Sequence, residues 1–313
     1  MNNDAAPIGA VGVVGAGAVG QATAAALVTS GLASRLLVTS RTSSRAAALV
    51  ADLDDMRAAL RGSTRPLTCH PADLMDCDAV VVALRASFTN TRATDVRMAG
   101  ASANGALIAA LAGKLRGYGG TVLMVTNPVD LMSRLFAEAS GCRRVYGIGS
   151  ALDTARYRAA LATHLGAPLA AVNGQVIGEH GDHLVVCASS TTVNDEPADV
   201  PVPVIFNELC SRPGRISAGI GRTRYGPAGA VLETVHLALG LADGTTQLST
   251  AHQGGWLGIP LRFTAGRPIP CLPQLTPSEA TRFQAADAKL RTAYEALGPA
   301  LQPILSTPER NLP

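Results

Sequence analysis

The feature that most constrains this chain is a glycine-rich turn between a short apolar run and an alanine-rich segment. Residues 11–14 read VGVV, and glycines then follow in the spacing G-x-G-x-x-G. In a strand–turn–helix unit the first glycine permits the turn, the second lets the backbone approach a pyrophosphate, and the third lets the helix pack on the strand. The pattern predicts a dinucleotide site at a helix N-terminus, and the alternative is a tight turn without a ligand. The residues expected around the pyrophosphate are Gly15, Gly17, Ala18, Val19 and Gly20.

Apolar runs and helical segments alternate through the first half of the chain. We expect strands at 11–14, 36–38, 79–84 and 121–126, and helices at 18–29, 43–60 and 101–115. This alternation is typical of an α/β protein with a Rossmann-type, doubly wound parallel sheet.

The pattern changes near residue 148. We expect helices at 151–165, 228–241 and 277–297, with extended, turn-rich segments at 172–186 and 191–204 between them. Thr276 is the expected N-cap of the last helix. The sequence therefore predicts a dinucleotide-binding domain over residues 1–148 and an α+β substrate or catalytic domain over residues 149–313.

Charge and apolar patterning narrow the class of partner. The 26 basic and 23 acidic side chains are scattered, with no run of five like charges, so we expect no nucleic-acid partner. The chain has no run of 18 apolar residues and no signal-peptide pattern, so we expect a cytoplasmic protein without a membrane segment. The six cysteines have no zinc-binding spacing, and we expect reduced thiols and no metal site.

The segment after the second expected strand indicates which dinucleotide is bound. An acidic residue about 20 positions after the glycines normally binds the ribose 2′-hydroxyl, but here the position is Ser40. Hydroxyls at Thr39 and Ser40 and the guanidinium of Arg41 suit a 2′-phosphate instead. Arg45 would add a second charge on the same face if the helix has begun at Arg41. The segment predicts NADP rather than NAD, and the alternative is a solvated arginine beside a loop.

Four stretches together resemble the lactate/malate dehydrogenase family, in the family's order and near its spacing. They are the glycine loop, TNPVD at 126–130, LDTAR at 152–156 and GEHGD at 178–182. The resemblance extends from Val11 to about Leu297. It implies hydride transfer between a nicotinamide and a 2-oxo or 2-hydroxy acid, and an assembly of two or four copies.

The resemblance implies a role for each catalytic candidate. His180 is the acid/base, Asp153 orients it and raises its pKa, and Arg156 binds the substrate carboxylate. The spacing of Asp153 and Arg156 places both on one face of a helix. Asn127 is expected to touch substrate and nicotinamide, unless it is only a turn former before a proline. His180 could instead pair with His183 on a metal or be a structural loop residue.

The resemblance also implies a mobile loop with an arginine that polarises the ketone. The loop reads RASFTNTRATDVR, from Arg85 to Arg97. Counting back from Asn104, which matches a family asparagine at the cofactor, selects Arg97 as the polarising residue. Arg92 is the alternative polarising residue. If Arg97 has that role, Arg92 lies near the position that discriminates between substrates. Facing the pocket, Arg92 would recognise a second acidic group of the substrate; if it faces water, Phe88 would line an apolar pocket.

Gly226 occupies the far-wall position of the family's substrate pocket, in the segment RYGPAGA. A glycine there leaves room for a larger substrate, or relieves a tight turn before Pro227. The sequence as a whole predicts an NADP-preferring L-2-hydroxy acid dehydrogenase. The alternatives are an NADP malate dehydrogenase and a regulatory protein that binds a nicotinamide without turnover.

Overall fold

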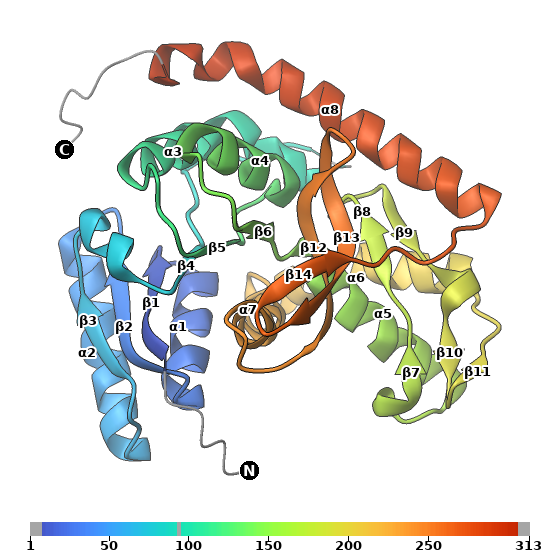
Figure 1. Cartoon of the computed structure of the whole chain (residues 1–313), viewed down its shortest axis with the longest axis horizontal. Helices are drawn as coiled ribbons and strands as arrows, with labels where there is room; N and C mark the ends of the chain where they lie inside the picture. The colour runs from blue at the N-terminus through green and yellow to red at the C-terminus, as the bar shows by residue number, and fades with distance from the viewer. Residues whose placement is uncertain (1–7, 93–94, 306–313) are drawn as a thin grey trace.

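A parallel sheet forms the N-terminal half of the protein, seen in a computed structural model that describes residues 8–92 and 95–305 (Figure 1). Its strand order is 3-2-1-4-5-6, the Rossmann order. The strands in that order are β3 (Arg65–Thr68), β2 (Ala33–Thr39), β1 (Ile8–Val14), β4 (Ala79–Val82), β5 (Thr121–Met124) and β6 (Val145–Gly147). The predicted α/β fold class is confirmed.

Helices cover both faces of this sheet, and the strands alternate between two apolar clusters. In β1, Val11 and Val13 face the helices α1 (Ala18–Ser30), α2 (Ser43–Leu60) and α7 (Tyr225–Ala238). Ala10 and Val14 face the opposite cluster. That cluster contains α3 (Ala101–Lys114), α4 (Val129–Ser140) and the long helix α8 (Pro277–Leu305). Side chains alternate because successive residues of a strand point to opposite faces.

The same sheet continues beyond residue 148 through antiparallel strands. β6 pairs with β12 (Gly244–His252), and the order continues through β13 (Gly255–Thr264), β8 (Val176–Gly178) and β9 (Leu184–Val186), with β14 (Arg267–Pro270) beside β13. The helix α5 (Gly149–Leu165) packs on β8 and β12. The remaining elements are α6 (Val202–Ile220), the small sheet of β7 (Val172–Asn173), β10 (Thr192–Val193) and β11 (Glu196–Pro197), and the 3-10 helices η1 (Pro71–Asp76), η2 (Val96–Gly100), η3 (Leu169–Ala171) and η4 (Ala188–Ser190). Division into two domains at residue 148 stays a prediction.

Several elements depart from the sequence expectation. Residues 202–204 were expected to be extended but form the first turn of α6, where a proline is well tolerated. The helix then continues through Pro213, although a proline within a helix usually ends or kinks it. The elements β3, α4, β12 and β13 were not predicted. The helix expected at 228–241 is α7 and begins three residues earlier. The expected cap of α8 is confirmed, since Thr276 and Glu279 exchange hydrogen bonds in a capping box.

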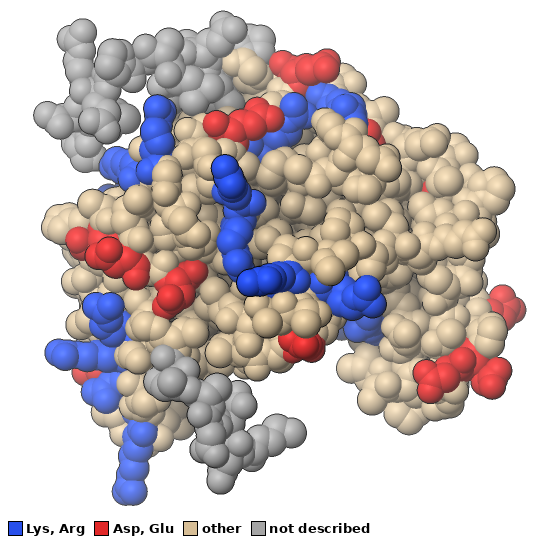
Figure 2. All heavy atoms as spheres, viewed as in Figure 1, with Lys and Arg blue, Asp and Glu red and all other residues tan. Residues whose placement is uncertain are grey.

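Charged side chains of both signs are scattered over the face shown in Figure 2, most of which is neutral. Within residues 8–92 and 95–305, no helix combines the length and apolar content that a bilayer crossing requires. The same residues contain no group of three histidine, cysteine or acidic side chains able to hold a metal ion.

Candidate active site

A cavity of about 510 Å³ lies at the carboxyl edge of the parallel sheet. Its walls include the glycine loop and the residues that follow β4 and β5. The strand order reverses between β1 and β4, and ligands of doubly wound sheets bind at this kind of switch point. The start of α5, the His180 loop and part of α6 close the opposite side.

The three glycines of the loop differ in what surrounds them. Gly15 has φ of 118°, and a Cβ there would lie 2.5 Å from the carbonyl oxygen of Ala83. A Cβ on Gly20 would collide with the carbonyl of Gly15, so the first and third glycines allow close packing. Gly17, by contrast, is the N-cap of α1, lines the cavity and has nothing within 4 Å of a Cβ position. The loop therefore fits a pyrophosphate at the N-terminus of α1, bounded by Ala18 and Val19.

The residues predicted to bind a 2′-phosphate follow β2, next to this loop. The N–H of Gly15 donates to the carbonyl of Thr39 at 2.8 Å, which holds the two turns side by side. Thr39 is buried, Ser40 is half-buried, and Arg41 is exposed. Arg45 is exposed in the first turn of α2, but Arg41 precedes the Thr42 cap of that helix. The helix has therefore not begun at Arg41, and the condition for a shared helix face is not met, although both arginines remain near the end of β2.

The structure brings the three catalytic candidates together. Nδ1 of His180 lies 2.6 Å from Oδ2 of Asp153, and Oδ1 of Asp153 lies 3.6 Å from Nη1 of Arg156. Exposed fractions are only 8%, 1% and 6% for His180, Asp153 and Arg156, so solvent screens these charges little. Since Asp153 occupies Nδ1, the other ring nitrogen is left for a ligand in the cavity that His180 lines.

Two neighbours fix the position of His180. A Cβ on Gly149, the first residue of α5, would collide with the His180 side chain, so only a glycine allows this approach. The N–H of His180 donates to Oδ2 of Asp130 at 3.0 Å. Burial raises the pKa of Asp130 to about 7, even though the His180 N–H stabilises its charged form.

The protonation of the buried pair differs from the sequence expectation. Burial lowers the pKa of His180, the charge of Asp153 opposes this, and Arg97 and Arg156 lower it further. Burial alone would raise the pKa of Asp153, but His180 and the two arginines outweigh burial and lower it. Asp153 thus raises the pKa of His180 as predicted, but burial and the two arginines outweigh it, so the net pKa in the free protein is lowered and the expectation that Asp153 keeps the ring charged is not met.

Asn127 and Asn104 form one wall of the cavity. The amide of Asn104 donates to the carbonyl of Asn127 at 2.7 Å, and its oxygen accepts from the N–H of Ala86 at 2.8 Å. The side-chain oxygen of Asn127 is buried and has no hydrogen-bond partner among the described residues. A buried acceptor without a partner at a cavity wall is suited to bind a polar ligand.

The two loop arginines lie in different surroundings. Arg97, in η2, lines the cavity, and its charge acts on both Asp153 and His180. Arg92 does not line the cavity. Its side chain is half exposed, and its Nη1 lies 3.5 Å from Oδ2 of Asp95. The structure thus brings Arg97, and not Arg92, to the catalytic candidates. Residues 93–94 of this loop lie outside the described residues.

Gly226 is not part of the cavity wall. It is exposed in the first turn of α7, and its φ is not in the left-handed region, so no tight turn requires a glycine. A Cβ there would lie 2.8 Å from Cδ1 of Leu152, which does line the cavity. The room expected at Gly226 is therefore partly filled by Leu152. Phe88 lines the cavity, with the Arg85 guanidinium 4.3 Å above its ring.

Sequence reasoning missed two further arginines at the cavity, Arg85 and Arg222. Burial and the charge of Arg222 lower the pKa of Arg85, so the two are close enough to interact. Arg85 could have been found, because it directly follows the strand expected at 79–84 and so lies near the ligand-binding edge of the sheet. Arg222 follows α6, which the sequence did not predict.

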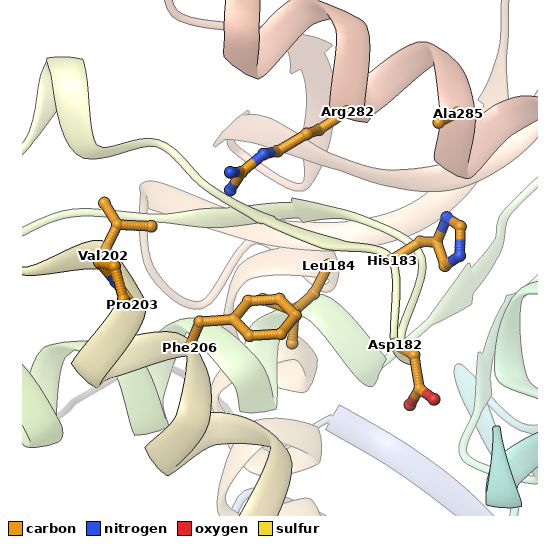
Figure 3. Close-up of a pocket in the computed structure, with 8 residues that line it drawn as sticks. All are labelled: Asp182, His183, Leu184, Val202, Pro203, Phe206, Arg282 and Ala285. Carbon is orange, nitrogen blue, oxygen red and sulfur yellow. The ribbon is translucent and has the colours of Figure 1, made fainter. Parts of the chain in front are cut away.

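A second hollow, of about 460 Å³, lies between α6, α8 and the His180 loop. Figure 3 shows Arg282 extending from α8 toward it and Phe206 entering from α6. It shares Asp182 with the larger cavity but contains none of the predicted site residues. The larger cavity, by contrast, is lined by the predicted catalytic residues His180, Arg156 and Arg97.

Comparison with known sequences identifies similar proteins. A family model described as "lactate/malate dehydrogenase, NAD binding domain" matches residues 10–149. An L-lactate dehydrogenase of Lactobacillus delbrueckii subsp. bulgaricus is 28% identical over 306 residues, covering 91% of this chain and 98% of that protein. A malate dehydrogenase of Methanosphaera stadtmanae is 36% identical over 138 residues, which are 41% of this chain and 43% of that protein.

Solved structures agree on the fold. The malate dehydrogenase of Aeropyrum pernix has a TM-score of 0.83 at 25% identity, and the alignment covers 93% of this chain and 100% of that one. A lactate dehydrogenase from a Medee basin deep-sea metagenome has a TM-score of 0.86 at 21% identity, covering 94% and 100%. The fold thus extends over nearly the whole chain.

Proposed function

Because this chain belongs to the lactate/malate dehydrogenase family, we propose that it is an NADP-preferring L-2-hydroxy acid dehydrogenase that works as a 2-oxo acid reductase. One observation carries the proposal. The buried cluster of His180, Asp153 and Arg156 lies at the same cavity as the glycine loop. A regulatory protein without turnover has no need of all three charged groups.

The reaction divides between the cofactor and the protein. A bound reduced nicotinamide would supply the hydride that adds to C2 of the 2-oxo acid. Arg156 holds the substrate carboxylate through paired N–H groups. Arg97 stabilises the negative charge that develops on the ketone oxygen, and His180 donates a proton to that oxygen. Asp153, bonded to Nδ1, stabilises the charged His180 ring before this proton leaves, and the product is a 2-hydroxy acid.

The preference for NADP rests on the end of β2. No carboxylate stands where a ribose 2′-hydroxyl is normally bound, because residues 39–45 read TSRTSSR. The hydroxyls of Thr39 and Ser40 and the guanidinium groups of Arg41 and Arg45 favour a phosphate. The family model itself is that of an NAD-binding domain, so this preference distinguishes the chain within its family.

A second candidate, a reductase of a doubly anionic 2-oxo acid, is favoured by the charge of the cavity. Four arginines line it: Arg85, Arg97, Arg156 and Arg222. Among the described side chains only Arg156 of these four pairs with a carboxylate. One substrate carboxylate would neutralise Arg156, so Arg85 and Arg222 favour a second anionic group on the substrate. This assigns to them the role that the sequence gave to Arg92.

The test is the initial rate of NADPH and NADH oxidation with pyruvate, oxaloacetate, phosphonopyruvate and branched 2-oxo acids. Faster turnover with NADPH supports the proposal, and tight NADPH binding without turnover of any acid favours the regulatory alternative. Arg222→Gln should lower kcat/KM about tenfold or more for the dianionic acids alone if the second candidate holds. Arg116→Gln, which removes an exposed arginine outside the cavity, is the control.

A further inference from the structure

Lys289 of α8 joins two loops that meet at the cavity. Its Nζ lies 2.8 Å from Oδ1 of Asp95, and 2.7 and 2.9 Å from the two carboxylate oxygens of Glu179. Asp95 is the N-cap of η2 and stands two residues before Arg97, while Glu179 directly precedes His180. One ammonium group thus connects the segments that carry Arg97 and His180.

The ion cluster of Lys289, Asp95 and Glu179 is largely buried, so the position of each charged side chain depends on the other two. The side chain of Glu179 is only 3% exposed, compared with 20% for Lys289 and 24% for Asp95. A buried carboxylate is costly without a cation, so Lys289 stabilises the position of Glu179. Burial alone would lower the pKa of Lys289, but the two carboxylates outweigh burial and raise it, so the lysine stays charged at neutral pH.

A hydrogen bond adds a second link between the two loops, since the N–H of Asp95 donates to Oδ2 of Asp182 at 2.9 Å. Within the His180 loop, the N–H of His183 donates to Oε2 of Glu179 at 3.0 Å and helps to hold that carboxylate in place. Asp95 has φ of 51°, in the left-handed region that non-glycine residues seldom adopt. The ion pair and the hydrogen bond to Asp182 compensate for that conformation, which sets the direction in which η2 leaves the loop.

We propose that Lys289 is a positioning residue: through Asp95 and Glu179 it holds the Arg97 segment against the His180 segment, so that both side chains reach the same substrate oxygen. The inference rests on the proposed function for the roles of Arg97 and His180. It adds a residue from α8, a helix that carries none of the predicted site residues. Lys289 itself does not line the cavity.

The most informative variant is Asp95→Asn. Asparagine tolerates the left-handed backbone as well as aspartate does. This change therefore removes the ion pairs of Asp95 with Lys289 and with the exposed Arg92 at little backbone cost, and it leaves Lys289 on Glu179. We expect kcat/KM for the 2-oxo acid to fall about 10- to 100-fold, with the dissociation constant of NADPH unchanged. Lys289→Gln should show at least as large a loss, because it also leaves Glu179 without a cation. Lys289→Arg should restore part of the loss, and combining Asp95→Asn with Lys289→Gln should cost little more than Lys289→Gln alone.

The matched control is Asp54→Asn, which removes a carboxylate from an exposed pair with Arg57 on α2 and should leave kcat/KM unchanged. Hydrogen exchange supplies a readout that does not need turnover. Backbone amides of residues 95–100 and 178–184 should exchange faster in Asp95→Asn than in the unaltered protein. Unchanged exchange there overturns the inference, even if the unaltered protein reduces no 2-oxo acid and the proposed function fails. Normal kcat/KM in Asp95→Asn, with an active parent protein, also overturns it.

Discussion

The cluster proposed to be catalytic and the turn after β2 contrast in how the protein holds them. His180, Asp153 and Arg156 are each less than a tenth exposed and are joined by an ion pair and a hydrogen bond. In the turn, every residue from Arg41 to Arg45 is exposed. The only hydrogen bond of the turn toward the glycine loop is made by the carbonyl of Thr39, among the described residues.

This contrast separates two kinds of contribution to activity. In the cluster each charge is compensated by the others in a medium that screens little, so the loss of one residue leaves partners unpaired. In the turn the charges face water, where salt screens them, so a substitution alters the affinity for a ligand and leaves its neighbours in place. Substitutions in the cluster should therefore affect the chemical step, and those in the turn should affect cofactor choice.

The largest expected effect is that of His180→Asn. Asparagine preserves a polar side chain but cannot transfer a proton, so kcat should fall by about 10²- to 10⁴-fold. The dissociation constant of NADPH, measured by fluorescence titration, should stay within about twofold, because the glycine loop is untouched. Near-normal turnover would remove His180 from the acid/base role.

The next effect distinguishes the two loop arginines. Arg97→Gln should lower kcat/KM by about 10²-fold, because it removes a positive charge from the place where the ketone oxygen develops negative charge. Arg92→Gln is its matched partner from the same loop and should change kcat/KM by no more than about twofold. The reverse ranking would contradict the positions of these two side chains in the structure.

The sequence predicted best those features that one local pattern determines. The three glycines, the Asp153–Arg156 pair on α5 and the Thr276 cap each depend on residues within one turn or one helix, and the structure has all of them in place. Helix α6 was missed because Pro213 and Gly214 interrupt its pattern, although tertiary packing keeps the helix intact.

Features that depend on distant contacts could not be predicted. Whether Arg92 or Arg97 enters the cavity is decided by η2 and by Asp95, which is anchored by Lys289 nearly 200 residues later. The net pKa of His180 depends on its burial and on Arg97, neither of which follows from the spacing of the motifs. The space beside Gly226 depends on Leu152 of another helix.

The turn after β2 should respond to Ser40→Asp with a change in cofactor preference. The added carboxylate repels a 2′-phosphate and accepts hydrogen bonds from a 2′-hydroxyl, so kcat/KM for NADPH should fall about 10- to 100-fold while that for NADH rises. The loss with NADPH should shrink as salt is added, since this turn is open to solvent. Ser44→Asp is the control, because that side chain bonds to Thr42 at the start of α2 and is not among the residues predicted to bind the phosphate. Unchanged NADPH kinetics in Ser40→Asp would contradict the assignment of the turn to the cofactor.

The smallest expected effect, a displaced pH profile, tests whether the two regions are independent. Reduction needs a proton on His180, and burial with Arg97 and Arg156 lowers its pKa below the ordinary 6.5 in the free protein. The kcat/KM for reduction should therefore be greatest below that pKa and fall about tenfold per pH unit above it, with the opposite dependence for oxidation. A bound carboxylate neutralises Arg156, so the corresponding fall in kcat should occur at higher pH. Arg97→Gln should move the kcat/KM profile to higher pH, because the charge of Arg97 lowers the pKa of His180. Ser40→Asp should leave the profile in place. A shifted profile in Ser40→Asp would show that the exposed turn and the buried cluster are coupled.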